Sequence, residues 1–188
     1  MPLPERPTRD AVVLIGHGAP ATDCPPELVG ELMGLEWHAN NAATSAGNTE
    51  RLQRRVEELD AKIRDWPRHA GNDPYKAGLE RIAAVVKRML PTDLFAVGYN
   101  EFCRPSIHEA VEQVIRQGAT HVFVIPSMLT PGGLHAEQDI PQALDAVRRL
   151  HPDVAIAYIW PFDVTQVAAL LASHVHAARR GVPHEATP

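Results

Sequence analysis

AVVLIGHG, residues 11–18, joins an unbroken apolar run to a histidine that lies between two glycines. An apolar run without polar alternation is typical of a strand that is buried on both faces, as in a parallel sheet. The two glycines remove side chains on either side of His17, so a backbone turn or a flat ligand can approach the imidazole closely. Alone, His17 is explained equally well as the end of a strand and as part of a functional site.

Two later apolar runs also lead to a polar side chain. Residues 93–99 precede Glu101, and residues 121–126 precede the loop that ends at His135. In an open α/β sheet, ligands bind outside the carboxyl ends of the strands. We therefore expect His17, Glu101 and His135 to converge on one ligand if the first strand lies between the other two. The sequence leaves that strand order open.

Helical segments separate these strands. Apolar residues recur at helical spacing over residues 52–66, 79–90, 107–115, 140–150 and 164–175, and a fourth strand is expected at 154–159. Strands that alternate with helices lie parallel and are joined by right-handed crossovers. The chain is therefore predicted to be an α/β protein with a three-layer open sheet of about four parallel strands and helices on both faces.

Three details of the predicted helices follow from local patterns. Pro105 suits the first turn of the helix that follows it, and Asp139 is a plausible cap for the helix that starts near Ile140. The last helix is predicted to pack one apolar face, which consists of Val164, Val167, Ala168, Leu171 and Val175.

The segment between the first two strands departs from the regular order. Residues 19–92 contain two of the predicted helices and stretches rich in proline, asparagine and glycine. We interpret residues 1–180 as a single domain, with residues 19–92 as a helical insertion within it. Residues 181–188 are predicted to be a flexible tail.

The composition is that of an ordinary globular protein. The 188 residues are 45% hydrophobic and carry a net charge of −5, which argues against nucleic acid as a partner because phosphates need a basic surface. We see no apolar stretch long enough for a signal peptide or a membrane span, and no glycine-rich nucleotide motif. Cys24 and Cys103 lie far apart, so a reducing, cytoplasmic location is expected.

Two histidines and a carboxylate favour metal or acid–base chemistry. Neutral imidazole and carboxylate together suit borderline divalent metals such as iron, cobalt, nickel and zinc, and histidine also exchanges protons near neutral pH. Cys103 could join such a site, but a small buried thiol is the better interpretation. His108 and Glu112, four residues apart on a helix, could also chelate a metal, although an exposed polar pair is favoured.

Three segments resemble one known family. They are IGHG at 15–18, GYNEFCRPSI at 98–107, and PSMLTPGGLH at 126–135 followed by DIP at 139–141. Together they resemble the sirohydrochlorin cobaltochelatase and ferrochelatase family, the small class II chelatases of the CbiX/SirB type. The most specific part is the Gly-Gly loop with its histidine and the DIP segment.

The resemblance implies a chelatase that inserts Co²⁺, Fe²⁺ or Ni²⁺ into a sirohydrochlorin-type tetrapyrrole without ATP or another nucleotide. By the matching motifs, His17, Glu101 and His135 would be the catalytic and metal-binding residues, with the histidines also accepting the pyrrole protons. The metal is then a substrate. A homodimer is implied as well, because larger chelatases have two related halves and this chain has one. A non-catalytic carrier of a tetrapyrrole or metal on the same fold is the alternative.

The long segment 19–92 is the main departure from the short members of that family. Trp66 and Tyr75 could form the flat apolar surface of a lid over the macrocycle, with Arg68 reaching a substrate carboxylate. A helix hairpin packed on the domain is at least as good an interpretation. Because sirohydrochlorin is a polycarboxylate, cations are expected near it, and the candidates are Arg68, Lys76, Arg104 and Arg148.

Overall fold

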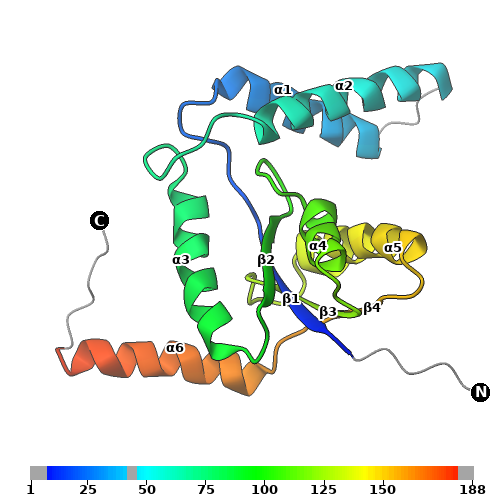
Figure 1. Ribbon diagram of the computed structural model, residues 1–188. Coiled ribbons are helices and arrows are strands. Elements are labelled where there is room, and N and C mark those ends of the chain that lie inside the picture. Colours follow the sequence, from blue (N-terminus) through cyan, green and yellow to red (C-terminus); the bar gives the residue numbers. More distant parts are fainter. Residues whose placement is uncertain (1–7, 42–45, 182–188) are drawn as a thin grey trace, which may run out of the picture.

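The apolar runs form a single parallel sheet in the computed structural model, which describes residues 8–41 and 46–181. Its strands are β1 (Asp10–Gly16), β2 (Leu94–Tyr99), β3 (His121–Pro126) and β4 (Ala155–Tyr158). Their order is β2-β1-β3-β4, so the first strand lies between the second and the third (Figure 1). This is the order that convergence of the three polar side chains requires.

The register of the sheet brings the ends of three strands to one level. Ile15 of β1 pairs with Gly98 of β2 and with Pro126 of β3. The segments that follow these strands therefore leave the sheet side by side at its carboxyl edge. His17 and Glu101 are placed there directly by this register.

Helices cover both faces of the sheet, which confirms the predicted three-layer α/β fold. They are α3 (Pro74–Met89) on one face, and α4 (Ile107–Arg116) and α5 (Ile140–Leu150) on the other (Figure 1). The central strand β1 is buried from both sides because its side chains alternate between the faces. Val13 belongs to the cluster with α4 and α5, whereas Leu14 packs with Leu79 of α3.

Ser106, and not Pro105, caps the start of α4. The Ser106 hydroxyl accepts a hydrogen bond from the backbone N–H of Glu109, and the Glu109 carboxylate accepts one from the backbone N–H of Ser106. This reciprocal capping box satisfies two N–H groups that the helix leaves unpaired. The prediction that Pro105 lies in the first turn was therefore wrong, because the proline precedes the cap.

Two further helices lie beyond the carboxyl edge of the sheet. α1 (Pro26–Asn41) and α2 (Ala46–Arg64) pack side by side, and we call them the helical pair (Figure 1). Leu32, Leu59 and Ile63 are buried between them. The sequence pattern predicted α2 but not α1, because the apolar residues of α1 do not form one stripe along the helix.

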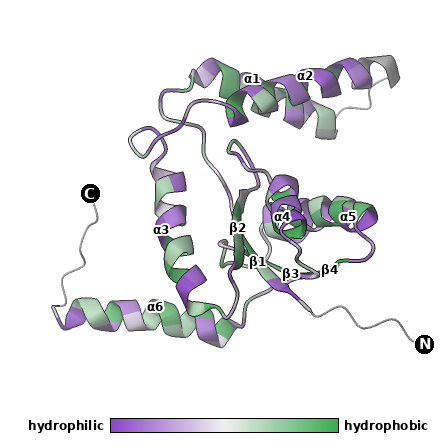
Figure 2. Cartoon of the chain, in the orientation of Figure 1, coloured by the Kyte–Doolittle hydropathy of each residue, from purple (hydrophilic) through white to green (hydrophobic). Residues whose placement is uncertain are grey.

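The last helix, α6 (Val164–Arg179), is exposed along most of its length. Its apolar residues are visible as green segments in Figure 2. The prediction that this chain packs a face made of Val164, Val167, Ala168, Leu171 and Val175 was therefore wrong. An amphipathic pattern indicates that one face of a helix is suited to burial, but it does not show which surface buries that face. In the structure, α6 runs past the end of α3 and away from the sheet (Figure 1).

Some predictions about the whole chain stay predictions. The tail expected at 181–188 lies outside the described residues beyond Gly181. The boundaries of the single domain and its insertion, and the cytoplasmic location, are likewise untested. None of the helices within residues 8–41 and 46–181 combines the length and the apolar character that crossing a membrane requires.

Candidate metal centre

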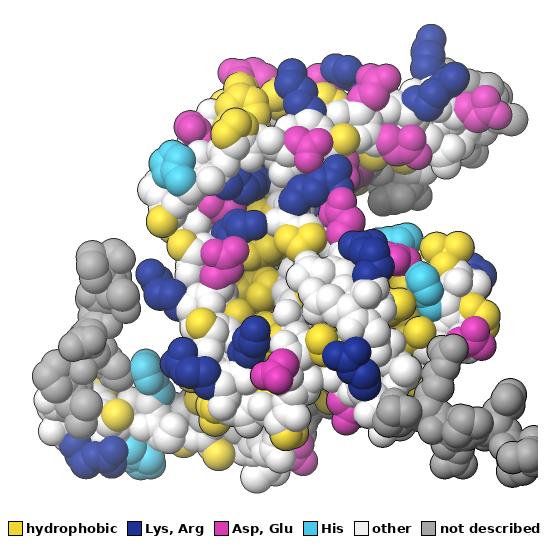
Figure 3. Space-filling model, in the orientation of Figure 1, with side chains coloured by type: hydrophobic (Ala, Val, Ile, Leu, Met, Phe, Trp, Pro, Cys, Tyr) yellow, Lys and Arg dark blue, Asp and Glu magenta, His cyan; other side chains and the backbone are white. Residues whose placement is uncertain are grey.

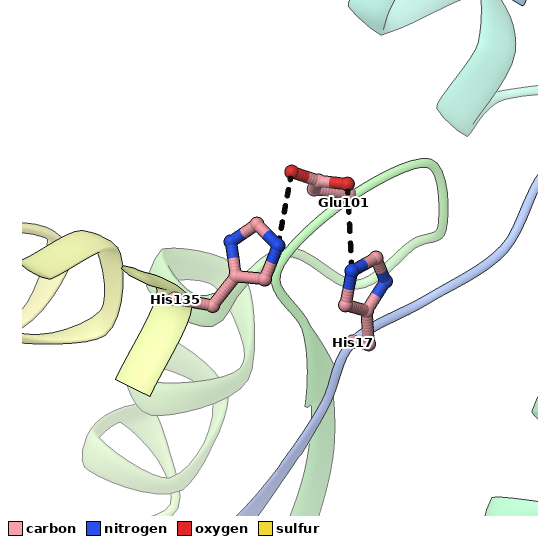
Figure 4. Close-up of side chains that lie close together, drawn as sticks. All are labelled: His17, Glu101 and His135. Atoms are coloured by element: carbon pink, nitrogen blue, oxygen red, sulfur yellow. Dashed lines mark ion pairs between the residues drawn. The ribbon is translucent and has the colours of Figure 1, made fainter. Parts of the chain in front are cut away.

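His17, Glu101 and His135 meet at the carboxyl edge of the sheet. His17 follows β1, Glu101 follows β2, and His135 opens a short π-helix (His135–Asp139) that leads into α5. One potential ligand atom from each residue lies within 4.8 Å of the other two. Figure 4 shows both imidazoles turned toward the carboxylate: Nε2 of His17 lies 3.9 Å from one Glu101 oxygen, and Nε2 of His135 lies 3.7 Å from the other.

A backbone contact determines which nitrogen of His17 is free. Its Nδ1 lies 2.8 Å from the carbonyl oxygen of Gly18. Because a carbonyl oxygen can only accept, Nδ1 carries the proton and Nε2 keeps its lone pair in the neutral imidazole. That lone pair is available to a metal ion or a proton on the side of Glu101.

A carboxylate has the same effect on His135. Asp139 lies 2.6 Å from Nδ1 of His135, and the side-chain amide of Asn100 lies 2.9 Å from the same nitrogen. The carboxylate can only accept and the Asn100 amide nitrogen can only donate, so the two contacts favour opposite tautomers. The contact with the charged carboxylate is the shorter one and favours a proton on Nδ1, which leaves the Nε2 lone pair for a ligand. Asp139 occupies the N-cap position of α5, as predicted, but its carboxylate contacts His135 and makes no capping hydrogen bond. The four-residue spacing of this pair was the sequence signal that could have revealed it.

Backbone hydrogen bonds join the loops of His17 and Glu101. The N–H of Glu101 donates to the oxygen of His17 at 2.8 Å, and the N–H of Asn100 donates to the oxygen of Gly16 at 2.9 Å. Gly18 has a φ of +94°, and a Cβ at that position would lie 1.9 Å from the Glu101 carbonyl oxygen. Gly18 therefore makes room for the backbone of the neighbouring loop.

The three side chains form a suitable donor set for a divalent metal. Two imidazole nitrogens and a carboxylate oxygen suit iron, cobalt, nickel and zinc. The side chains of His17, Glu101 and His135 are 39%, 32% and 26% exposed, so a metal ion can reach them from solvent. Nitrogen and oxygen ligands lie about 2.0–2.2 Å from such an ion, so small side-chain rotations bring the three donors into coordinating positions.

A cleft of about 890 Å³ opens beside these side chains. Glu101 and His135 lie on one side of it, and the helical pair lines the other side, where Met33 and Trp37 of α1 are exposed. Figure 3 shows that the molecule is hollowed between the helical pair and the part that holds α4 and α5. This volume lies in the range of small-molecule binding sites.

Carboxylates are concentrated in the cleft. Glu36, Asp60, Glu101 and Asp139 all line it. Burial raises the pKa of Glu36, and the negative charges of Glu101 and Asp60 raise it further. A cleft with this charge suits the attraction of divalent cations toward the candidate metal centre.

The side chains predicted to form a lid make contacts within the domain, and none of the three lines the cleft. Trp66 packs on the core of the helical pair. The hydroxyl of Tyr75 accepts a hydrogen bond from the backbone N–H of His17 at 2.8 Å, and Arg68 forms a buried ion pair with Asp73. The lid prediction was therefore wrong for these three residues, and the structure supports the alternative of a packed helix hairpin.

The cations expected to bind substrate carboxylates are also engaged elsewhere. Each donates hydrogen bonds to protein oxygens, and within the described residues none of them lines the cleft: they are Arg68, Lys76, Arg104 and Arg148. The structure therefore gives that prediction no support at this cleft, because sequence position does not reveal which oxygens these side chains bind. The sequence did not identify Trp37 and Met33 as residues that line the cleft, because apolar residues in a helix usually belong to a core.

The remaining candidate ligands follow the interpretations favoured from the sequence. Cys103 is fully buried, and burial raises the pKa of its thiol. Nε2 of His108 lies 3.5 Å from Glu112, which also binds His151. Cys103 is thus a small buried thiol, and His108 and Glu112 form a polar pair outside the centre.

Exchanging Asp139 for asparagine is expected to weaken Co²⁺ binding about 10- to 100-fold. Asparagine keeps the size of the side chain but removes the charge that favours the Nδ1 proton of His135. Isothermal titration calorimetry with Co²⁺ measures the change. Asp145→Asn, at an exposed position of α5, is the matched control. Equal affinity of both variants and the wild type would show that Asp139 does not tune His135.

Comparison with known proteins finds matches both in sequence and in fold. The model of the family described as CbiX matches residues 71–178. A sirohydrochlorin ferrochelatase from Priestia megaterium is 29% identical over 119 residues, which cover 62% of this chain and 43% of the relative. A sirohydrochlorin cobaltochelatase from the same organism is 31% identical over 100 residues, which cover 53% and 32%. The matched part of this chain thus spans less than half the length of these two curated relatives.

A solved structure of similar size has the same fold. It is described as a cobalamin (vitamin B12) biosynthesis CbiX protein from Marinobacter aquaeolei VT8. The match covers 93% of this chain and 99% of that chain, with a TM-score of 0.54 and 16% sequence identity. At this identity the likeness concerns the fold alone.

Proposed function

This chain belongs to the CbiX family, and on that premise we propose that it is a chelatase that inserts a divalent metal into a sirohydrochlorin-type tetrapyrrole. The observation that carries the proposal is the pair of Nε2 atoms of His17 and His135, which face Glu101 beside the cleft. The relatives are named as ferrochelatase and cobaltochelatase, so Fe²⁺ and Co²⁺ are the first metals expected. Ni²⁺ suits the same donors.

Metal insertion exchanges one divalent ion for the two pyrrole protons of the macrocycle. In the proposed mechanism the ion first binds the two Nε2 atoms and the Glu101 carboxylate, which replace part of its water shell. As the ion passes to the macrocycle nitrogens, both lone pairs become free, and each can accept one displaced proton. Asp139 stabilises the imidazolium of His135, whereas His17 donates to a neutral carbonyl. We therefore propose that the contact with Asp139 orients His135 to receive a displaced proton. The reaction requires no nucleotide.

The proposed position of the macrocycle is between the metal centre and α1. Trp37 and Met33 are 63% and 57% exposed on the side of the cleft formed by the helical pair. Burial of these apolar surfaces against a flat ring is favourable. The carboxylates of the cleft repel the acidic groups of the substrate, so we place those groups toward solvent.

An anaerobic visible-spectrum time course tests this function. The metal-free protein is mixed with sirohydrochlorin and then with Co²⁺, Fe²⁺ or Ni²⁺, alongside a blank without protein. Metal insertion faster than in the blank is the expected result, and the rates rank the metals. A shifted spectrum without acceleration would favour the carrier instead, and an unchanged spectrum would contradict both functions.

We also propose that two copies of this chain assemble as a homodimer. The segments that match the two curated relatives cover less than half of their length. In addition, α6 exposes Leu170 and Leu171, and β3 carries the partly buried Phe123 on the face opposite α4 and α5. The apolar face of α6 from one copy is therefore suited to cover apolar surface of the other.

The double variant Leu170→Glu and Leu171→Glu is expected to be monomeric where the wild type is dimeric. Two charges on the exposed face of α6 make its burial in an interface unfavourable. Size-exclusion chromatography with light scattering measures the mass of both proteins. Leu150→Glu, at an equally exposed leucine of α5, is the matched control and should stay dimeric. A wild type that is monomeric at every concentration would contradict the dimer.

A further inference from the structure

Arg64, the last residue of α2, binds the backbone of the loop that carries Glu101. Its Nη2 donates to the oxygen of Asn100 at 2.7 Å, and its Nη1 donates to the oxygen of Cys103 at 2.9 Å, so the two contacts flank Glu101. Its Nε donates to Asp60 at 2.7 Å, which orients the guanidinium toward the loop. The Arg64 side chain is 12% exposed, and hydrogen bonds from a charged donor with little competing water are strong.

Arg68 binds the loops of both His17 and Glu101. One of its terminal nitrogens donates to the oxygen of Phe102 at 2.5 Å, and the other donates to the oxygen of Ala19 at 2.8 Å. These two oxygens lie one residue beyond Glu101 and two residues beyond His17. The guanidinium is buried and neutralised by Asp73. A single buried side chain thus links the two loops, in addition to the backbone hydrogen bonds that join them directly.

The backbone of the Glu101 loop needs such support. Phe102 has a φ of +58°, in the left-handed region that is unfavourable for a bulky residue. Conformations of this kind persist where surrounding contacts hold them. The contacts from Arg64 and Arg68 reach the carbonyl groups on either side of this strained position.

We propose that Arg64 and Arg68 are positioning residues that hold Glu101 where its carboxylate meets the two Nε2 atoms. The inference rests on the proposed function, because the two arginines can position a metal ligand only if Glu101 binds the metal. Neither arginine supplies a donor atom to the centre, and both act through backbone carbonyls. The end of α2 and the segment after it thus serve the metal centre as its support.

A double-mutant cycle between Arg64 and Glu101 tests the proposal. The Kd of Co²⁺ is measured by its visible absorption without tetrapyrrole, for the wild type, Arg64→Met, Glu101→Gln and the double variant. Arg64→Met is expected to raise the Kd about tenfold in the wild-type background and to have no effect once Glu101 is glutamine. Arg64→Lys, which can still bind one carbonyl oxygen, should recover part of the affinity. Arg55→Met, on an exposed part of the same helix, should leave the Kd unchanged.

The outcomes separate the inference from the function on which it rests. If Arg64→Met weakens binding equally in both backgrounds, Arg64 does not act through Glu101 and the inference is overturned while the metal site stands. The same holds if Arg64→Met leaves the Kd of a cooperatively folded protein unchanged. If the wild type does not bind Co²⁺, the proposed function fails and the inference fails with it.

Discussion

Replacing His135 by alanine is expected to slow metal insertion about 10²- to 10⁴-fold, the range that a positioned proton acceptor contributes. The change removes the proposed metal ligand and proton acceptor at once, and it leaves Asp139 without its partner. His17→Ala is expected to cause a smaller loss, because its Nδ1 binds a neutral backbone carbonyl and its removal leaves no carboxylate without a partner. Initial rates with sirohydrochlorin and Co²⁺ measure both effects.

His121→Ala is the matched control for these variants. His121 starts β3 at the opposite edge of the sheet, and its side chain is 34% exposed, close to the value for His17. Its replacement should leave the rate unchanged. An undiminished rate in His135→Ala would mean that another group receives the protons, and the proposed mechanism would have to be abandoned.

Arg68→Met is expected to have the largest effect on stability, a loss of about 3–5 kcal/mol in the free energy of unfolding. The substitution leaves the carboxylate of Asp73 buried without its counter-charge, and Asp73 is 2% exposed. It also removes hydrogen bonds to the oxygens of Ala19 and Phe102. For a chain of this length, the melting temperature should fall by roughly 6–20 °C. Thermal unfolding followed by circular dichroism measures the shift.

An arginine in an exposed ion pair provides the comparison. Arg55 of α2 binds Glu31 of α1, and both side chains are largely open to solvent. Exposed pairs contribute little to stability, so Arg55→Met should melt at nearly the wild-type temperature. Equal melting temperatures of Arg55→Met and Arg68→Met would show that the buried ion pair of Arg68 contributes no more to stability than the exposed one of Arg55.

The sheet and the three central side chains could be predicted because their signals are local. A strand that is buried on both faces has no polar position, so a run such as residues 11–15 is recognisable without any tertiary information. His17 and Glu101 closely follow two such runs. Parallel strands bring their carboxyl ends to one edge, and β1 between β2 and β3 brings the ligands together.

The supporting contacts of the site, the lining of the cleft and the exposure of α6 could not be predicted, because they depend on contacts between distant segments. Nothing near Arg68 in the sequence shows that its guanidinium reaches backbone oxygens at Ala19 and Phe102. The sequence around Trp37 would look the same whether its helix packed in a core or lined a cleft, so the exposure of Trp37 could not be predicted. The pattern of α6 marks a face to be covered but does not say that this chain leaves the face open.

The support of the Glu101 loop has a consequence for how metal preference can change. Arg64 and Arg68 bind main-chain oxygens, which every amino acid possesses. We therefore expect the location of position 101 to depend little on the side chain found there. Glu101→His would present an imidazole at that location and Glu101→Cys a thiolate, which are ligands of different softness. A single codon change can thus redirect the chemistry of this centre, in evolution or by design, without rebuilding the scaffold that holds it.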